Sequence, residues 1–425
     1  MRKVIIQRPQ HIAPFNEPAR NLRVLNKPLW LHQRDLLTRY CSDEREVPSF
    51  EQIPNQPLEM LVHSDNLFFD QPFLDRFIQE AVRRGRPCRA AFSTSDPAYM
   101  QQSLGRLTRH FEQQNDLYYV DLWYFPQGPT TNYEAVVIPS DAREVGYYHV
   151  PNYMAPQQGD LVYWLPERVV CSIETWIHVL FANIVFGVFT IGNRFELRVN
   201  KDFGFKLKVL WRALLEQRQI LSCSELVKVG RNAQIDPSAI IQGPTIIGDN
   251  VSIGPGCVVA NSIIGNNVTL SQGNQIMLSV ISDGCFLPWN ASMFMTVFME
   301  NSMVAQNTCL QMCVVGRNSF IGAGTIFTDF NVLPVPLKQV VDGHMVEINQ
   351  PVLGGCVGHN CRLGSGLVIY PARTIESDVV LIASPSRRVI MKNISFEESD
   401  HHAARGAHLH PRQYPRMDEI TESAW

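Results

Sequence analysis

The sequence predicts an α/β domain followed by a parallel β-helix, and two observations predict this fold. In the second half of the chain, apolar residues recur every 17 positions and open steps of six, six and five residues: Ile247, Ile264, Ile281, Phe298 and Val315. Repeats of this kind indicate a solenoid in which each step is one short strand, with the leading residue and a small residue four positions later pointing inward. The first half instead alternates strand-like and helical stretches, which is typical of an α/β domain.

The α/β domain is predicted to span residues 1–222. Its strand-like runs are Val4–Ile6, Leu58–His63, Cys88–Phe92 and Leu117–Tyr124. Its helical stretches are Leu29–Tyr40, Pro72–Arg84 and Pro97–Gln113. This alternation predicts a partly parallel sheet. Two later helices, Glu174–Thr190 and Phe205–Gln219, are expected to bridge to the repeat.

The repeat is predicted to occupy residues 223–395 and to form about seven or eight coils, stacked ~4.8 Å apart. The pattern breaks after Ile326 and resumes at Val357, so residues 327–354 are interpreted as an insertion. The polar stretch 396–425 has no periodicity. For its histidines a disordered tail is favoured over a metal site; they are His401, His402, His408 and His410.

Composition excludes several classes of function. The net charge of −3 over 425 residues implies no attraction to nucleic acid or to an anionic membrane. The most apolar stretch, Trp176–Ile191, is shorter than the ~18 residues that a membrane span needs, so it predicts a buried helix. The N-terminus lacks a signal-type apolar run. The ten cysteines form no CxxC pair, and Cys257, Cys285 and Cys361 occupy small inward positions of the repeat. We interpret these cysteines as packing residues rather than as disulfide or metal ligands. Free cysteines of this kind indicate a reducing compartment, so we expect a cytoplasmic protein.

Three segments of the first domain resemble sugar-1-phosphate nucleotidylyltransferases. Pro18–His32 is similar to the stretch that follows their phosphate loop, Leu61–Phe68 to the strand end that supplies a metal-binding aspartate, and Thr175–Asn183 to a Trp-x-x-x-x-x-Asn helix. In the repeat, Gly322–Thr325, an insertion and then Gly354–Gly358 follow the same order as the archaeal-type branch of the bifunctional nucleotidylyltransferase/N-acetyltransferase family. The resemblance implies a left-handed β-helix, a sugar phosphate or nucleotide sugar as substrate, and acetyl-CoA as co-substrate.

The chain departs from that family where the nucleotide phosphates would bind. No glycine precedes Gly85, although glycine lets backbone N–H groups approach phosphate closely. Arg20 stands one position beyond the place of the family's lysine. These departures favour acyl transfer over nucleotidyl transfer. Asp65, at the expected C-terminal end of a strand, is the candidate ligand for Mg²⁺, and the alternative is that Asp65 begins a local turn.

In the repeat, acyl transfer needs a general base near the substrate. The family's turn after Gly-Ala-Gly-Thr lacks a histidine here, which leaves His344, His359 and Asp329 as candidates beside a plain surface role for the histidines. Ala383–Arg388 resembles the closing motif of hexapeptide acyltransferases, whose basic residue meets the phosphates of CoA. The corresponding candidates are Arg387, Arg388 and Lys392, with a solvated basic face as the alternative.

Two classes of function therefore remain open. One is a transferase of nucleotide-sugar metabolism, and the other is a non-catalytic protein that binds a sugar nucleotide or serves as a scaffold. A zinc carbonic anhydrase on the same solenoid is disfavoured, because it needs three histidine ligands and only His344 and His359 lie in the repeat.

Apolar columns on the coils also predict assembly. Residues 17 positions apart stack vertically, and the apolar ones expected to point outward are Leu278, Met295, Met312, Met277, Phe294, Phe286, Met303 and Phe320. A patch of this kind is seldom exposed on a monomer. The sequence predicts a homotrimer, with cover by the first domain or by the insertion as the alternatives.

Overall fold

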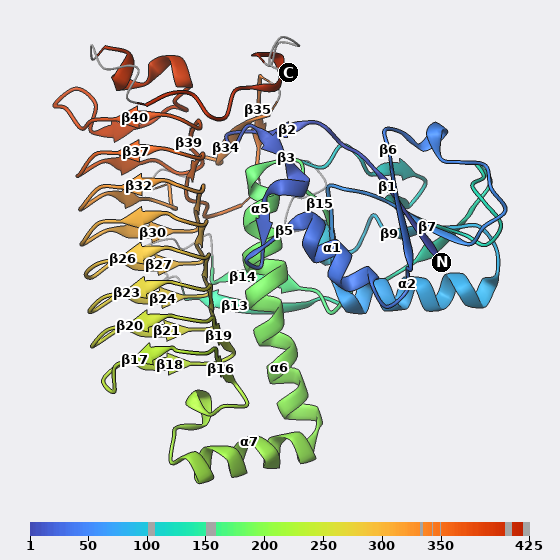
Figure 1. The fold of residues 1–425 in the computed structure, drawn as a ribbon, viewed down its shortest axis with the longest axis horizontal. Coiled ribbons are helices and arrows are strands. Elements are labelled where there is room, and N and C mark those ends of the chain that lie inside the picture. The colour runs from blue at the N-terminus through green and yellow to red at the C-terminus, as the bar shows by residue number, and fades with distance from the viewer. Residues whose placement is uncertain are drawn as a thin grey trace. The chain divides into compact units, whose positions relative to one another are not determined.

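The computed structural model describes residues 1–100, 107–149, 159–331, 335–341, 343–348, 350–403 and 410–419 (Figure 1). The chain forms two compact units, one of Met1–Ile12 with Pro18–Ala182 and the other of Ala13–Glu17 with Asn183–Trp425. The second unit begins before residue 222 because the bridging helices pack on the repeat. Val209 and Ala213, for example, belong to the core of the β-helix.

The first unit is built on a mixed sheet, as predicted, with the strand order β12-β9-β11-β7-β1-β6 and β10 paired to β11. β1 is parallel to β6 and to β7, whereas β11 is antiparallel to β7 and β9. The sheet strands are β1 (Arg2–Ile6), β6 (Asp43–Val47), β7 (Met60–Ser64), β9 (Cys88–Ser93), β10 (Glu112–Gln114), β11 (Leu117–Phe125) and β12 (Glu134–Val137). Shorter strands are β2 (His11–Ile12), β3 (Glu17–Pro18), β4 (Arg23–Val24), β5 (Lys27–Pro28), β8 (Leu67–Phe69), β13 (Arg143–Tyr148), β14 (Leu161–Leu165) and β15 (Val170–Ser172).

Two of the three predicted helices of this unit are confirmed, as α1 (Leu29–Leu37) and α2 (Gln71–Arg84). The Asp70 carboxylate caps α2 by accepting a hydrogen bond from Phe73 N, and Gly85 ends it in the left-handed conformation. The third prediction is wrong for most of its length. Only Pro97–Met100 is helical (α3), Glu112–Gln114 is a strand, and residues 101–106 lie outside the described residues.

The first bridging helix is longer than predicted. α5 (Trp176–Asn183), a π-helical turn (Ile184–Phe189) and α6 (Thr190–Lys201) form a single helix, Trp176–Lys201, which is long and apolar enough to cross a membrane. However, 83% of its most apolar window is buried inside the protein, which agrees with the predicted buried helix. α7 (Phe203–Glu216) follows, with the Asp202 carboxylate as its N-cap.

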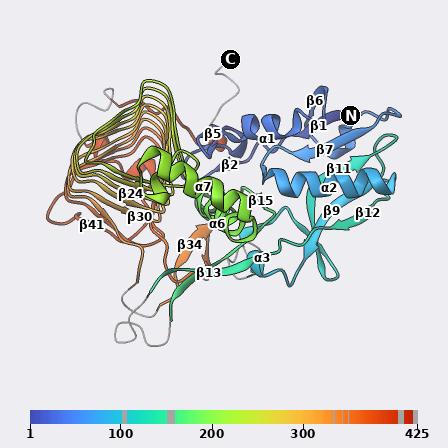
Figure 2. The same ribbon diagram turned by 90° about the horizontal axis from the view of Figure 1, so that it is seen from below.

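The repeat forms three parallel sheets of eight strands, a β-helix of the left-handed, hexapeptide-repeat kind. Viewed along the stack, the coils superpose in a three-sided outline (Figure 2). The first sheet contains β16 (Val227–Val229), β19 (Thr245–Ile247), β22 (Ile263–Ile264), β25 (Val280–Ile281), β28 (Val297–Phe298), β31 (Val314–Val315), β36 (Cys356–Val357) and β39 (Thr374–Ile375). The second contains β17 (Gln234–Ile235), β20 (Ser252–Ile253), β23 (Thr269–Leu270), β26 (Phe286–Leu287), β29 (Met303–Val304), β32 (Phe320–Ile321), β37 (Arg362–Leu363) and β40 (Val380–Leu381). The third contains β18 (Ile240–Gln242), β21 (Val258–Ala260), β24 (Gln275–Met277), β27 (Ser292–Phe294), β30 (Cys309–Gln311), β33 (Ile326–Phe327), β38 (Val368–Ile369) and β41 (Val389–Ile390).

The predicted register holds throughout the described coils. Each residue of the 17-position series pairs with the next, and the series continues past the insertion through Val315↔Val357. Their side chains are buried, as are those of Cys257, Cys285 and Cys361. Asparagines turn many of the corners in the left-handed conformation, which asparagine tolerates better than other residues with a side chain, for example Asn267 with φ 55°.

Two expectations about the surface of the repeat need correction. Met295 and Met312 are only 1% and 3% exposed, although both occupy left-handed corners of the coil. At Met312 the end of the insertion covers the corner, where Gly354 N–H donates to Met312 O at 3.0 Å. Phe286, by contrast, does point outward and is 40% exposed.

The polar stretch 396–425 is largely ordered where the structure describes it, contrary to the expectation of a disordered tail. It contains the 3₁₀ turns η5 (Phe396–Glu398), η6 (Asp400–His402) and η8 (Met417–Glu419). The order comes from ion pairs and hydrogen bonds to the last coils, such as Arg416–Glu376 and Asp378 accepting from Tyr414 N. His408 lies outside the described residues.

Candidate functional site

In the first unit, Asp65 lies where the sequence places it, directly after β7 at the C-terminal edge of the sheet. Its carboxylate is nearly inaccessible to solvent. Arg8 N–H donates to Asp65 Oδ1 at 2.9 Å, and Arg20 Nη1 lies 3.5 Å from Oδ2. Burial raises the pKa of Asp65 to about 6, and the contacts with these arginines only partly offset that effect.

A second buried carboxylate, Asp121 on β11, lies at the same edge and was missed from the sequence. It accepts hydrogen bonds from Ser64 Oγ at 3.0 Å, Arg8 Nη2 at 2.7 Å and Arg89 Nη2 at 3.0 Å. Arg8 therefore bridges Asp65 and Asp121. The available signal was a single charged residue inside the otherwise apolar and aromatic run Leu117–Phe125.

These groups do not fit a Mg²⁺ site. A divalent cation needs free carboxylate oxygens, whereas those of Asp65 and Asp121 already face arginine side chains or backbone N–H groups. Among the described residues there is no group of three His, Cys, Asp or Glu side chains that could hold a metal ion. The edge is a charge-neutralised network of arginines and carboxylates.

In the repeat, His359 is fully buried and both of its ring nitrogens are engaged. Nδ1 accepts from Arg317 N at 2.9 Å, which leaves the proton on Nε2 for donation to Glu17 Oε1 at 3.0 Å. Phe15 and Tyr414 pack against the ring. Burial lowers the pKa of His359, so the ring is held neutral. This environment favours a structural role for His359 over general-base chemistry.

His344 and Asp329 both belong to the insertion but differ in environment. His344 is exposed at the start of β35 (His344–Glu347), which pairs with β34 (Lys338–Val341). Asp329 is half-buried at the start of the insertion, where its carbonyl accepts from Leu353 N and closes the loop. Burial raises the pKa of Asp329. No interaction that the structure describes joins His344, His359 and Asp329.

The three predicted CoA-binding residues lie beside the last coils, and the tail engages two of them. Arg387 Nη1 donates to Asp400 Oδ1 at 2.5 Å, and Lys392 Nζ donates to Glu398 Oε1 at 2.6 Å. Arg388 is exposed and donates Nε to the carbonyl of Gly366 at 3.1 Å. The contacts of Arg387 and Lys392 with the tail were not predicted, because the sequence indicated a disordered tail.

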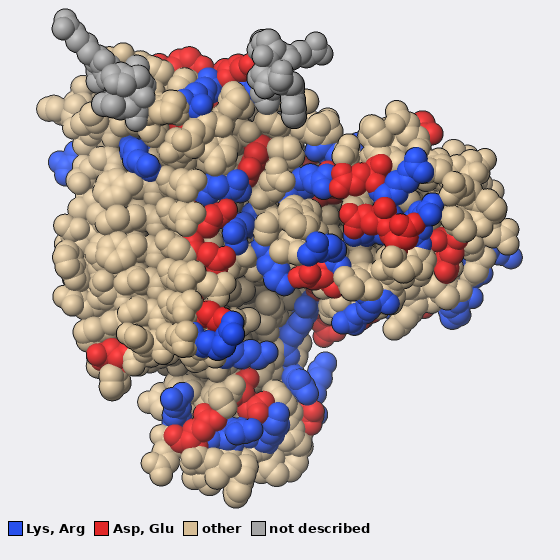
Figure 3. All heavy atoms as spheres, in the orientation of Figure 1, with Lys and Arg blue, Asp and Glu red and all other residues tan. Residues whose placement is uncertain are grey.

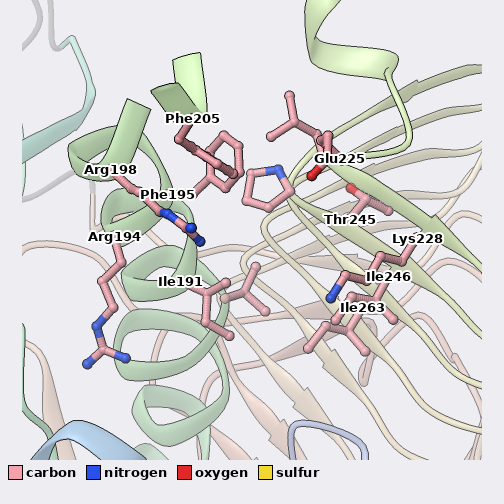
Figure 4. Close-up of a pocket in the computed structure, with 13 residues that line it drawn as sticks. Ile191, Arg194, Phe195, Arg198, Phe205, Glu225, Lys228, Thr245, Ile246 and Ile263 are labelled. Atoms are coloured by element: carbon pink, nitrogen blue, oxygen red, sulfur yellow. The ribbon is translucent and has the colours of Figure 1, made fainter. Parts of the chain in front are cut away.

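A pocket of about 420 Å³ opens between α6 and the first coils, both in the second unit. Its walls are mostly apolar, formed by Val188, Ile191, Phe195, Phe205, Leu226, Pro244, Ile246 and Ile263. Arg198 and Lys228 extend toward it from opposite walls, whereas Arg194 points away (Figure 4). Glu225 also lines the pocket, so an apolar group with a polar end could be accepted, and the charges of the wall are of both signs. No motif in the sequence marked it, because it forms only when α6 packs on the repeat.

Comparison with known proteins finds a likeness in the repeat. The family model described as bacterial transferase hexapeptide (six repeats) matches residues 227–261. A hexapeptide transferase family protein from Anaplasma phagocytophilum is 16% identical over 41% of this chain and 88% of that chain, with a TM-score of 0.21. The polysialic acid O-acetyltransferase OatWY is 22% identical over 40% and 80%, with a TM-score of 0.16. Such low structural scores carry no argument about activity. The periodicity and the three stacked sheets therefore make the second unit similar to bacterial hexapeptide-repeat transferases.

Proposed function

We propose that the chain is a hexapeptide-repeat acyltransferase that moves an acetyl group from acetyl-CoA to a sugar phosphate or nucleotide sugar in the cytoplasm. The observation that carries the proposal is the eight-coil β-helix, whose first coils match the transferase repeat and whose insertion interrupts the stack at Asp329. Nucleotidyl transfer is disfavoured, since the strand edge around Asp65 lacks both a glycine-rich loop and a fit for Mg²⁺.

Asp329 is the proposed general base. Its half-buried position and raised pKa suit proton transfer, because a carboxylate with a raised pKa is a stronger base. A hydroxyl or amine of the sugar attacks the thioester carbonyl carbon and passes its proton to Asp329. The C–S bond then breaks, and CoA leaves as a thiolate that takes up a proton. His344, exposed on the insertion hairpin, is the proposed contact for the sugar substrate.

Arg388 and Lys392 are the proposed contacts for the phosphates of CoA. Both are exposed beside the last coil, and guanidinium and ammonium groups pair readily with phosphate. Lys392 would exchange its surface ion pair with Glu398 for the phosphate. Arg387 is less available because Asp400 and the carbonyl of Glu398 hold its guanidinium group.

A homotrimer is part of the proposal. Phe286, Met303 and Phe320 follow one another on the outer face of the second sheet. Phe286 is exposed, as is Trp289 at a nearby corner, whereas Met303 and Phe320 are half-buried. The face of the repeat visible in Figure 3 carries few charged side chains. Exposed aromatic side chains such as Phe286 and Trp289 on a face with few charges favour burial between subunits. Because Met295 and Met312 are buried, a charge at Phe286 is the suitable disruption.

A second candidate function is a non-catalytic protein that binds a sugar nucleotide or serves as a scaffold. The arginine–carboxylate network around Asp65 and Asp121 favours it, since the edge expected to hold a metal is occupied by the protein's own cations.

The two functions separate in one set of measurements on the full chain. Acetyl-CoA should raise the melting temperature, and Arg388→Ala/Lys392→Ala should remove that shift, with Arg231→Ala at the other end of the repeat as the control. Release of free CoA thiol in the presence of UDP-sugars or sugar phosphates should fall about 100-fold or more in Asp329→Asn. A shift without thiol release would favour the scaffold, and the absence of any shift would refute acyl transfer from CoA.

A further inference from the structure

α7 (Phe203–Glu216) exposes a continuous row of large apolar side chains. Phe203, Trp211 and Leu214 are 78%, 59% and 68% exposed. The complete row consists of Phe203, Leu207, Leu210, Trp211, Leu214 and Leu215. Their spacing of three and four residues places them on one face of the helix, and the exposed Ile220 and Leu221 follow in the next turn.

The opposite face of α7 packs against the core of the β-helix and holds the helix in place. Val209 and Ala213 are buried in the core of the β-helix, and Phe205 packs against that core. α7 lies beyond the first coil (Figure 1). The helix is therefore amphipathic in an unusual sense, because the face turned away from the protein carries most of its large apolar side chains. A soluble surface rarely leaves such a row in water without a partner.

The charge of this segment indicates which partner fits. Between Thr190 and Lys228 the chain has eight Lys or Arg and four Asp or Glu residues, although the whole chain has a net charge of −3. On α7 itself, the exposed Lys206 flanks one side of the apolar row, and Lys208 and Arg212 flank the other. Lys208 and Arg212 share a single carboxylate, that of Glu225, so this side of the row keeps a net positive charge. An apolar face bordered by cations, with a tryptophan on it, is the pattern of helices that lie in the interface of an anionic membrane.

We propose that α7 is a docking surface for an anionic lipid bilayer, lying in the plane of the membrane with Leu207, Trp211 and Leu214 among the acyl chains. The lysines and Arg212 would then meet the lipid phosphates. A second copy of the chain fits less well, since pairing this face with itself would bring two cationic borders together. This inference goes beyond the proposed acyl transfer and does not depend on it.

Vesicle flotation with the full chain tests the proposal. The protein should float with vesicles of phosphatidylcholine and about 30 mol% phosphatidylglycerol at about 0.1 M NaCl, and about tenfold less at 0.5 M or with phosphatidylcholine alone. Leu207→Ser/Trp211→Ser/Leu214→Ser should lower the bound fraction about tenfold. The substituted side chains are exposed, so the fold should tolerate the change.

Ile382→Ser/Met391→Ser, which removes two exposed apolar side chains beside the last coils, is the matched control and should bind like the parent. The vesicle-induced blue shift of tryptophan emission should be lost in Trp211→Phe. Failure of the parent to float with anionic vesicles would overturn the proposal, as would equal binding by the triple variant. A parent assembly that the triple variant dissociates, without vesicle binding by either, would assign the face to contacts between copies.

Discussion

Glu17→Gln should destabilise the second unit, because Glu17 is the shared anion of a buried cluster on the late coils. Arg317 donates to both of its carboxylate oxygens, at 3.0 and 2.7 Å, and His359 Nε2 donates to Oε1 at 3.0 Å. Glutamine keeps one acceptor oxygen but removes the charge and places an NH₂ group against one of these donors. Arg317 and His359 then lose the group that compensates their burial.

The cost follows from what remains around Arg317. Removing one partner of a buried ion pair costs 3–5 kcal/mol, and Glu300, 3.0 Å from Arg317 Nε, still compensates part of the charge. We therefore expect a loss of about 3 kcal/mol in the free energy of unfolding, at the lower end of that range. The measurement is urea unfolding of the parent and the variant, with Glu347→Gln, an exposed glutamate of the same unit, as the control.

The cluster also predicts how stability changes with pH. Although burial opposes it, hydrogen bonds from His359 and Arg317 lower the pKa of Glu17, and burial lowers that of His359. Both groups bind more protons when unfolded, so their contribution is present at neutral pH. The part due to His359 is lost as the pH falls below 6.5, and that due to Glu17 as it falls below 4.5. A Glu17→Gln midpoint equal to that of Glu347→Gln at pH 7 would refute the reasoning.

Three further predictions concern the core and the strand edge. Phe298→Ala, at a fully buried position in the stack, should cost about 3–5 kcal/mol in urea unfolding, and a loss below about 1 kcal/mol would contradict the packing described. Burial raises the pKa of Asp65 from its ordinary value of 3.8 to about 6, so it binds more protons when folded and stability should decrease as the pH rises through this range. Asp65→Asn should abolish that decrease in thermal melts, and an unchanged pH profile would show that Asp65 is ionised throughout. Asp121→Asn should free the side chain of Arg8, whereas Arg89 stays paired with Glu112, and it should increase the affinity for UTP measured by calorimetry. Unchanged affinity would mean that Arg8 does not meet phosphate.

The repeat could be predicted from the sequence because its constraint is local. One strand, one corner and one inward residue recur in every coil, so the positions of Ile247 and Phe298 determine both register and burial. The same logic placed Cys257 inside the core. It failed at Met295 and Met312, because the period shows which residues lie at the corners of the coil and not whether their side chains are exposed.

The candidate sites were harder to predict because they depend on contacts between distant segments. Asp65 could be placed from the end of its strand, but its partner Asp121 lies on β11, and only the folded sheet brings Arg8 between them. His359 was a candidate base until Glu17, more than 300 positions earlier in the chain, was found against its ring. The spacing of neighbouring residues in the sequence contains no information about contacts between residues that lie so far apart along the chain.

The charge around α7 could not be predicted from the composition of the whole chain either. The net charge of −3 predicted no attraction to an anionic membrane, yet that value is a sum over a whole surface. Salt screens exposed charges over about 10 Å, so a membrane responds to the cations beside the contact and hardly to acidic residues far away. The apolar period of α7 predicted a helix but could not tell which of its faces packs on the protein. Since the structure assigns Val209 and Ala213 to the core, the larger apolar face is left beside Lys206, Lys208 and Arg212, and local rather than total charge decides what it binds.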